Sequence, residues 1–276
     1  MLFGHDWRAD GVMRIVASLA ETKFSPLNFD EQSPDNLPRM FNLIPSERSE
    51  ISKFAIQASE ESRGLLEVGS LHSFCGDRQD EHKSIHRYID LDHPLRETRS
   101  RELHDNPVAQ FWLLRHVLTK ISANGVRVCL GGKTQNYKGR FSGIAEEAFF
   151  ACRDNMPLYL VGGFGGATSE VAACFSQDPG SLFRDLNNGS PLKNHTKIKN
   201  GLTEHLSLTW KIPETDLSES FMEYGLENLG KCNGLNAYQN EELFRATDLE
   251  VVFHLMDVGL NNLVRDERIT PAHSSQ

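Results

Sequence analysis

The chain has 276 residues, of which 39% are hydrophobic and 24% charged, and its formal net charge is −9. This length suits one large α/β domain, or such a domain with a smaller helical appendage. The acidic balance argues against a broad positive surface for nucleic acid or for an anionic membrane, so neither partner is expected. Any bound phosphate must therefore be held by a local group of donors.

Cysteine usage and the length of the apolar runs indicate the compartment. The five cysteines include no C-x-x-C pair, which is typical of reduced thiols in a cytoplasmic protein. No apolar run is long enough to span a bilayer, and Met1-Leu2-Phe3 is too short for the apolar region of a signal peptide. We therefore expect a cytoplasmic protein.

The amino-terminal part of the chain contains short apolar runs between polar segments. Leu2 and Phe3 resemble a strand that has lost its beginning, which favours a chain trimmed from a longer polypeptide over a short edge strand. The elements expected next are a helix over Val12–Leu19, strands over Met40–Pro45 and Leu65–Val68, and a helix over Ile51–Arg63. Within this part, residues 46–106 are expected to be a charged insertion.

From Pro107 onward, helices and strands alternate. The expected elements are a helix from Pro107 to Ile121, a strand over Val126–Leu130, a helix over Gly143–Cys152, a strand and turn over Pro157–Gly166, and a helix ending at Phe175. This alternation predicts a Rossmann-like α/β fold, with a mostly parallel sheet covered by helices on both faces.

The remainder of the chain, residues 181–276, is expected to be a loop-rich segment followed by a helical extension. Its apolar stripe includes Leu249, Val252, Phe253, Met256, Leu260 and Leu263. This stripe suits either packing on the α/β domain, residues 1–180, or pairing with a second copy of the chain. A homo-oligomer is the expected state.

Two glycine-rich turns, each between an expected strand and an expected helix, are the most informative motifs. Glycine allows close approach of an anion, and the N–H groups at a helix start favour negative charge. The first turn also carries the cations Lys133, Lys138 and Arg140. Neither turn fits G-x-x-x-x-G-K-[ST] or G-x-G-x-x-G, which disfavours a conventional P-loop NTPase or dehydrogenase.

Two glutamates follow the first turn, at the expected helix start. Glu146 and Glu147 either accept a hydrogen bond from a ribose hydroxyl or simply complement the helix dipole. Ser142 and Thr168, at the starts of the two helices, are expected to act as caps rather than nucleophiles. The His82 and His86 pair more often marks a solvated polar face than zinc, so no metal site is predicted.

The turns resemble the SLOG superfamily. The resemblance rests on Leu130-Gly-Gly-Lys, Gly139, Gly143-Ile-Ala-Glu-Glu-Ala148 and Pro157-Leu-Tyr-Leu-Val-Gly-Gly-Phe-Gly-Gly166, with Gly4-His5-Asp6-Trp7-Arg8 similar to the family's first glycine turn. The superfamily groups DprA-like and LOG-like Rossmannoid domains with sensor domains of TRPM channels and of bacterial immunity effectors. The similarity spans roughly Leu2 to Phe175 and is closest to the immunity clusters linked to TIR domains.

This resemblance implies a sensor of ADP-ribose-type signals, including cyclic ADP-ribose isomers, in bacterial antiphage defence. It implies no other cofactor, and it makes a TIR-domain protein or a fused effector the expected partner. The residues that would contact the nucleotide are Asp6, Trp7, Arg8, Gly131, Gly132, Lys133, Tyr137, Lys138, Arg140, Gly143, Glu146, Glu147, Gly162, Gly163, Phe164 and Gly165.

Two alternatives stay open from the sequence. In the first, the protein is a nucleotide N-glycosidase or LOG-like phosphoribohydrolase, in which Glu146, Glu147 or Glu170 assists departure of the base. Catalytic LOG hydrolases carry P-G-G-x-G-T-x-x-E, whereas this chain lacks the proline and has its glutamate displaced by one position. In the second, the pocket is vestigial and the protein is an adaptor.

Overall fold

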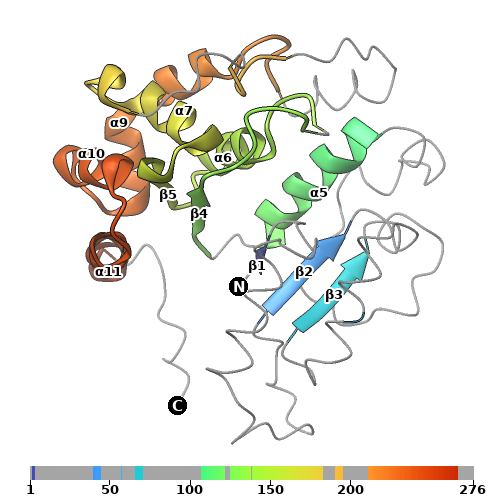
Figure 1. Ribbon diagram of the computed structural model, residues 1–276. Helices are drawn as coiled ribbons and strands as arrows, with labels where there is room; N and C mark the ends of the chain where they lie inside the picture. The colour runs from blue at the N-terminus through green and yellow to red at the C-terminus, as the bar shows by residue number, and fades with distance from the viewer. Residues whose placement is uncertain are drawn as a thin grey trace, which may run out of the picture. The chain divides into compact units, whose positions relative to one another are not determined.

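The structure is a computed structural model that describes residues 2–3, 40–44, 57, 66–70, 107–121, 125–137, 139–182, 190–194 and 211–266 (Figure 1). The chain forms two compact units, residues 1–105 and 106–276, and each is described here by itself. The sequence-based division into residues 1–180 and 181–276 stays a prediction.

The first unit contains a three-stranded parallel sheet. Its strands are β1 (Leu2–Phe3), β2 (Met40–Ile44) and β3 (Leu66–Ser70), in the order β1-β2-β3. The expected strands near residues 40 and 65 are confirmed, although β3 runs two residues further because all five of its residues pair with β2. Residues 2–3 do form a short strand, paired in parallel with β2. The helices expected over 12–19 and 51–63 lie outside the described residues, except Gln57, which is helical.

The second unit is built on two parallel strands, each followed by a glycine turn and a helix. It begins with α5 (Pro107–Ile121) and β4 (Arg127–Leu130), which leads to α6 (Gly143–Arg153). Next come β5 (Leu158–Val161), the single turn η3 (Gly162–Phe164) and α7 (Gly166–Phe175). The expected alternation of strand and helix is confirmed over this stretch, and β4 pairs with β5 from Arg127↔Leu158 to Leu130↔Val161.

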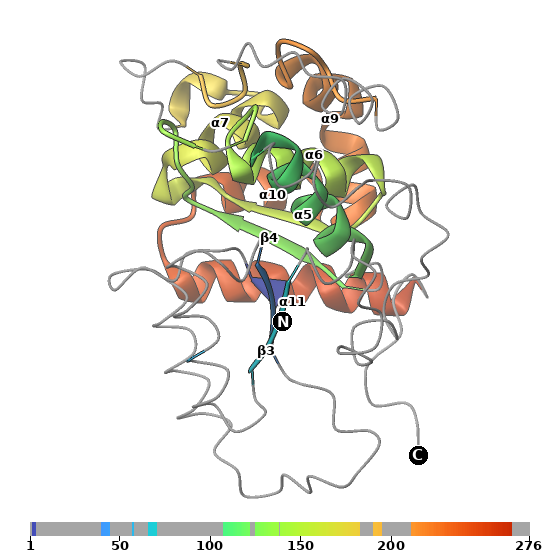
Figure 2. The ribbon, with the colours of Figure 1, turned by 90° about the vertical axis from the view of Figure 1, so that its right-hand side faces the viewer.

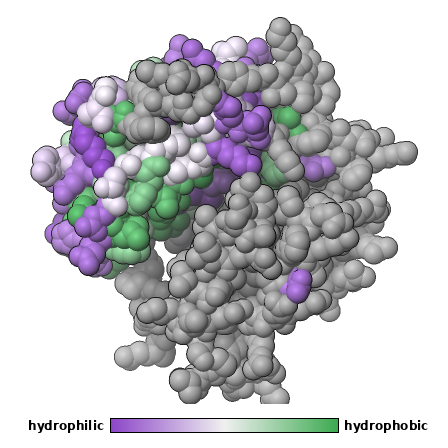
Figure 3. Space-filling view, viewed as in Figure 1, coloured by the Kyte–Doolittle hydropathy of each residue, from purple (hydrophilic) through white to green (hydrophobic). Residues whose placement is uncertain are grey.

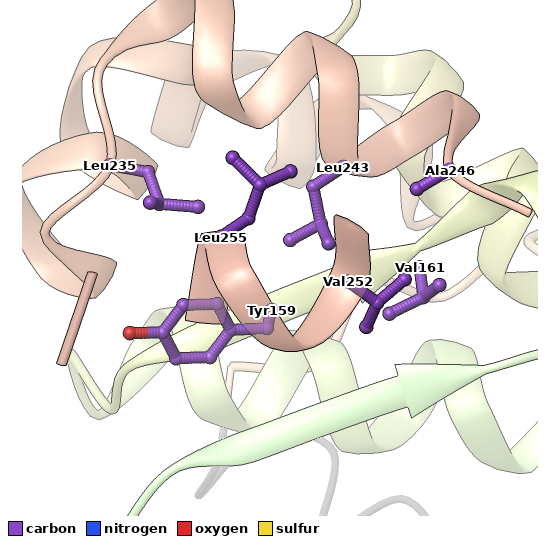
Figure 4. Close-up of a cluster of buried hydrophobic side chains, with 7 residues drawn as sticks. All are labelled: Tyr159, Val161, Leu235, Leu243, Ala246, Val252 and Leu255. Atoms are coloured by element: carbon purple, nitrogen blue, oxygen red, sulfur yellow. The ribbon is translucent and has the colours of Figure 1, made fainter. Parts of the chain in front are cut away.

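Helices cover both faces of β5, whereas Val128 and Leu130 on one face of β4 are exposed. Tyr159 and Val161 of β5 point into an apolar cluster formed with the carboxyl-terminal helices (Figure 4). Alternate residues of a strand face opposite sides, so Leu158 and Leu160 face the other way, where α6 contacts the strands. Figure 2 shows α11 along one side of the pair and α5 and α6 along the other. All four residues of β5 are buried, which suits a strand in a parallel sheet covered on both faces.

The helix α5 is buried over more of its circumference than the sequence indicates. Trp112, beside the apolar face of Leu114 and Leu118, is fully buried, and the polar Arg115 on the same helix is only 9% exposed. From residue spacing alone, a helix that mixes polar and apolar residues is predicted to expose its polar face to solvent. Here those polar groups have partners inside the unit, described below.

Three helices form the carboxyl-terminal extension: α9 (Ser218–Asn233), α10 (Ala237–Arg245) and α11 (Leu249–Arg265). The sequence predicts only a helical pattern beyond Glu241. It misses α9, whose interior residue Gly225 is non-helical at φ 73°, and it misses the first turn of α10, which a capping box between Asn236 and Gln239 begins.

The extension packs on the α/β part of the same unit. Val252 and Leu255 of α11 lie in the cluster with Tyr159 and Val161. The Tyr159 hydroxyl donates to the Asn233 carbonyl at 2.7 Å, and the Asn233 side chain donates to the Leu158 carbonyl at 2.9 Å. Val252 of the apolar stripe therefore packs on the α/β part, whereas Leu249 and Phe253 are exposed, and pairing with a second copy stays a prediction.

On the face drawn in Figure 3, the described residues form a hydrophobic area with hydrophilic residues around it. The exposed apolar side chains include Leu130 of β4 and Leu249 and Phe253 of α11. Among the described helices, none has the length and apolar character to cross a membrane.

Candidate functional site

The two glycine turns meet at the carboxyl edge of the β4–β5 pair. The first turn begins at Gly131, directly after β4, and the second begins at Gly162, directly after β5. Their backbones are hydrogen-bonded: the Thr168 N–H donates to the Gly131 carbonyl at 2.8 Å, and the Ala167 N–H donates to the Gly132 carbonyl at 3.2 Å. The structure therefore brings together the two motifs that the sequence singled out.

The positive end of α7 is already occupied in this arrangement. The N–H groups of a helix's first turn are those that would bind an anion. Here those of Ala167 and Thr168 are used by the first turn, whose Gly131 and Gly132 take φ values of 62° and 93°. A β-carbon at Gly166 would lie 2.5 Å from the Gly132 carbonyl oxygen, so only glycine allows this approach. Phosphate binding at α7 would require the first turn to move.

The second turn packs against the carboxyl-terminal extension. A β-carbon at Gly162 would lie 2.6 Å from the Phe244 carbonyl oxygen, and one at Gly163 would be still closer to the Ala246 carbonyl oxygen. The sequence assigned both glycines to one wall of a ligand site, whereas their small size is used here to admit α10. Phe164 is 45% exposed at this edge, and Gly165 is buried.

The first turn offers the more accessible surface. Lys133 is exposed, and the space beside Gly131 is open, with nothing within 4 Å of a β-carbon built there. The Ser142 hydroxyl donates to the Lys133 carbonyl at 2.7 Å, which ties the turn to the start of α6. Tyr137 donates its hydroxyl to the Lys193 carbonyl at 3.2 Å. Lys138 lies outside the described residues, as do Asp6, Trp7 and Arg8.

Glu146 is held inside the unit, beneath the first turn. Its carboxylate accepts from the Trp112 indole N–H at 2.6 Å and from the Phe141 N–H at 3.0 Å, and it forms an ion pair with Arg115. Burial, the largest influence, raises the pKa of Glu146, while Arg115 and the two hydrogen bonds act in the opposite direction. Both carboxylate oxygens thus have protein donors, where the sequence suggested a ribose hydroxyl.

The other two glutamates considered for catalysis lie on separate elements. Glu147 forms an ion pair with Arg127 of β4 at 3.1 Å, and both side chains are largely buried. Arg127 also donates to the Thr119 hydroxyl at 3.4 Å. Glu170 is half-buried on α7. Glu146 and Glu147 are consecutive residues that bind different partners, so they do not form a facing pair of carboxylates.

Sequence reasoning missed the contribution of α5 to this region. The Arg140 guanidinium carbon lies 5.6 Å from the centre of the Trp112 ring, close enough for a cation–π contact. Arg115 lies against Gly143, where a β-carbon would be 2.8 Å from one of its guanidinium nitrogens. An arginine and a tryptophan three residues apart in an apolar helix was the available signal, because such spacing places them on one face.

A shallow hollow of about 470 Å³ lies where α10 meets α11. Its lining is Tyr238, Glu241, Glu242, Arg245, Ala246, Thr247, Asp248 and Val251. Glu241 pairs with Arg245 at 2.8 Å and accepts from the Ser176 hydroxyl at 2.9 Å, so the only basic residue of the lining is already neutralised. This hollow is therefore less suited to phosphate than the first turn.

Comparison with known proteins identifies one family. The family profile described as SLOG cluster2 matches residues 94–243, more than half of the chain. The matched segment contains both glycine turns and reaches into α10, so it extends past Phe175, where the resemblance in the sequence was taken to end. Searches against curated proteins and against solved structures find no match.

Proposed function

We propose, from the premise that this chain belongs to the SLOG family, that it is a sensor for an ADP-ribose-like nucleotide in TIR-linked antiphage signalling. Family membership suggests a nucleotide-related function. The ADP-ribose or cyclic ADP-ribose ligand, the cytoplasmic location, the homo-oligomer and the TIR-domain partner or fused effector are parts of the proposal.

The observation that supports ligand binding is the meeting of two glycine turns at the carboxyl edge of adjacent parallel strands. Ligands of open α/β sheets bind at such an edge. Because the start of α7 is occupied by the carbonyls of Gly131 and Gly132, the pyrophosphate is assigned to the outer side of the first turn. There the exposed Lys133 would supply charge, the half-buried Arg140 would add to it, and Phe164 offers an exposed ring at the same edge.

The strand orders support a Rossmann-like fold within this proposal. Taken by itself, the first sheet has the order β1-β2-β3, and the second has the order β4-β5, all in parallel. Within each sheet, consecutive strands are parallel neighbours, as they are in one half of a doubly wound sheet. The helices on both faces of β5 agree with that architecture.

Calorimetric titration with ADP-ribose and with cyclic ADP-ribose isomers tests the proposal directly. Lys133→Ala and Arg140→Ala should each weaken binding at least about tenfold, since charge-assisted phosphate contacts contribute roughly 1.5–3 kcal/mol. Lys231→Ala removes an exposed cation on α9 and is the matched control, expected to bind as the wild type does. No binding by the wild type, or equal weakening in the control, would contradict the proposal.

The sensor is proposed not to turn over its ligand. The internal ion pairs of Glu146 and Glu147 support this, because a general acid or base must reach the substrate. NAD, AMP and ADP-ribose incubated with the protein should remain intact on chromatography. Release of free base that is lost in Glu170→Gln would instead support the N-glycosidase alternative.

A further inference from the structure

The turn over residues 139–143 is wrapped around a buried ion pair from two helices. Arg115 of α5 pairs with Glu146 of α6, and their side chains are 11% and 3% exposed. A β-carbon at Gly139 would lie 2.6 Å from a Glu146 carboxylate oxygen, and one at Gly143 would lie 2.8 Å from an Arg115 nitrogen. Both ends of the turn therefore rest directly on this pair.

One oxygen of Glu146 connects the turn to the ring beneath Arg140. Oε1 accepts both the Trp112 indole N–H and the Phe141 backbone N–H, while Oε2 faces Arg115. Phe141 follows Arg140 in the chain, and the Arg140 guanidinium lies over the Trp112 ring. The backbone next to Arg140 and the ring under its side chain are thus fixed by the same atom.

We propose that Glu146 is a positioning residue, which sets the place of Arg140 for the nucleotide phosphate through Trp112 and the Phe141 N–H. This inference rests on the proposed function, since it gives Arg140 a ligand. It assigns Glu146 a role different from a ribose contact, and it adds Trp112 to the residues on which binding depends.

A test must distinguish the effect of the negative charge of Glu146 from the effect of its oxygen as a hydrogen-bond acceptor. Removing Glu146 alone would leave Arg115 buried without its partner, and such variants often fail to fold. Replacing both members by neutral side chains avoids this problem. Arg115→Met/Glu146→Gln keeps a carbonyl oxygen for Trp112 and Phe141, whereas Arg115→Met/Glu146→Leu has similar volume and no acceptor.

The two double variants form the matched pair for the experiment. We expect Arg115→Met/Glu146→Gln to bind ADP-ribose within about threefold of the wild type. Arg115→Met/Glu146→Leu should bind at least about tenfold more weakly, which is the lower end of the loss seen when a residue that orients a metal ligand is replaced. Circular dichroism checks that both are folded. Equal affinities for the two folded variants would overturn the inference.

A second readout needs no ligand. Amide hydrogen exchange at Phe141 should be slow in the wild type and in Arg115→Met/Glu146→Gln, and fast in Arg115→Met/Glu146→Leu, because only the last lacks the acceptor. If the wild type binds no ADP-ribose, the proposed function fails while this exchange experiment still decides the role of Glu146. Equal exchange at Phe141 in all three proteins would overturn the positioning role.

Discussion

Individual buried polar residues connect the strands and helices of the unit formed by residues 106–276. Arg127 joins β4 to α6 through Glu147 and to α5 through Thr119, although β4 has only four residues. Cys129 lies on the same face of β4 and is completely buried. Burial, together with the charge of Glu147, raises the pKa of the Cys129 thiol to about 12.

The raised pKa of Cys129 predicts a loss of stability in alkali. Above pH about 8.5, where an unfolded thiol ionises, the unfolded chain loses a proton that the folded unit retains. The free energy of unfolding should then fall as pH rises, by about 1.4 kcal/mol per pH unit for this group, until its folded pKa is reached. Urea unfolding at pH about 8 and about 10 measures the slope.

Cys129→Ala provides the comparison for this pH dependence. It removes the titrating thiol and leaves Cys152, whose pKa burial also raises, in place. We expect a shallower fall of the unfolding free energy with pH in the variant than in the wild type. Identical slopes in the two proteins would show that the Cys129 thiol titrates normally in the folded chain.

The arrangement of the candidate site could be predicted from the sequence only in part. The order of glycines and cations in the first turn indicates an anion site, because glycine and charge act locally. The sequence could not indicate that the N–H groups of Ala167 and Thr168 are used by Gly132 and Gly131. That pairing depends on how close two turns come in space, and neither turn encodes the distance by itself.

At the scale of elements, the elements with regular apolar patterns were predictable. The strands β4 and β5 and the helices α6 and α7 follow short apolar runs bounded by glycine, so local pattern and tertiary structure agree. The helix α9 was not predictable because Gly225 interrupts it and its apolar content is low. Its stability comes from packing on α6 and α7, which a local pattern does not contain.

The close contact between the end of α10 and the second turn leads to a prediction about stability. Gly163→Ala should destabilise the protein by about 2 kcal/mol, because its β-carbon would overlap the carbonyl of Ala246 and force the α10–α11 connection outward. Thermal unfolding followed by circular dichroism is the measurement.

Gly180→Ala is the control for the Gly163→Ala experiment. It is exposed, and its β-carbon would meet only Asp178, at 3.7 Å. The melting temperature should therefore change little in Gly180→Ala and fall clearly in Gly163→Ala. Equal melting temperatures in the two variants would mean that α10 does not rest on Gly163 in solution.

At the scale of the whole molecule, net charge and local charge act in opposite directions on an anionic ligand. The chain carries −9 overall, while the outer side of the first turn presents Lys133. Binding of a nucleotide to the folded state alone must stabilise the unit of residues 106–276, by about 2.7 kcal/mol at a ligand concentration 100 times the Kd.

Thermal unfolding with and without ADP-ribose measures this stabilisation. We expect the melting temperature of the wild type to rise with nucleotide concentration, and that of Lys133→Ala to rise only at higher concentrations because its Kd is larger. An equal rise in both proteins would place the nucleotide away from Lys133. Light scattering on the same samples tests the homo-oligomer, which stays a prediction.

The contact between the two turns also limits how this sequence can drift over evolutionary time. The carbonyls of Gly131 and Gly132 fill the space that a side chain at position 166 would occupy. A larger residue at 166 is tolerable only if the loop after β4 changes its course in the same lineage. Positions 131, 132 and 166, distant along the chain, should therefore vary as a set among its homologues.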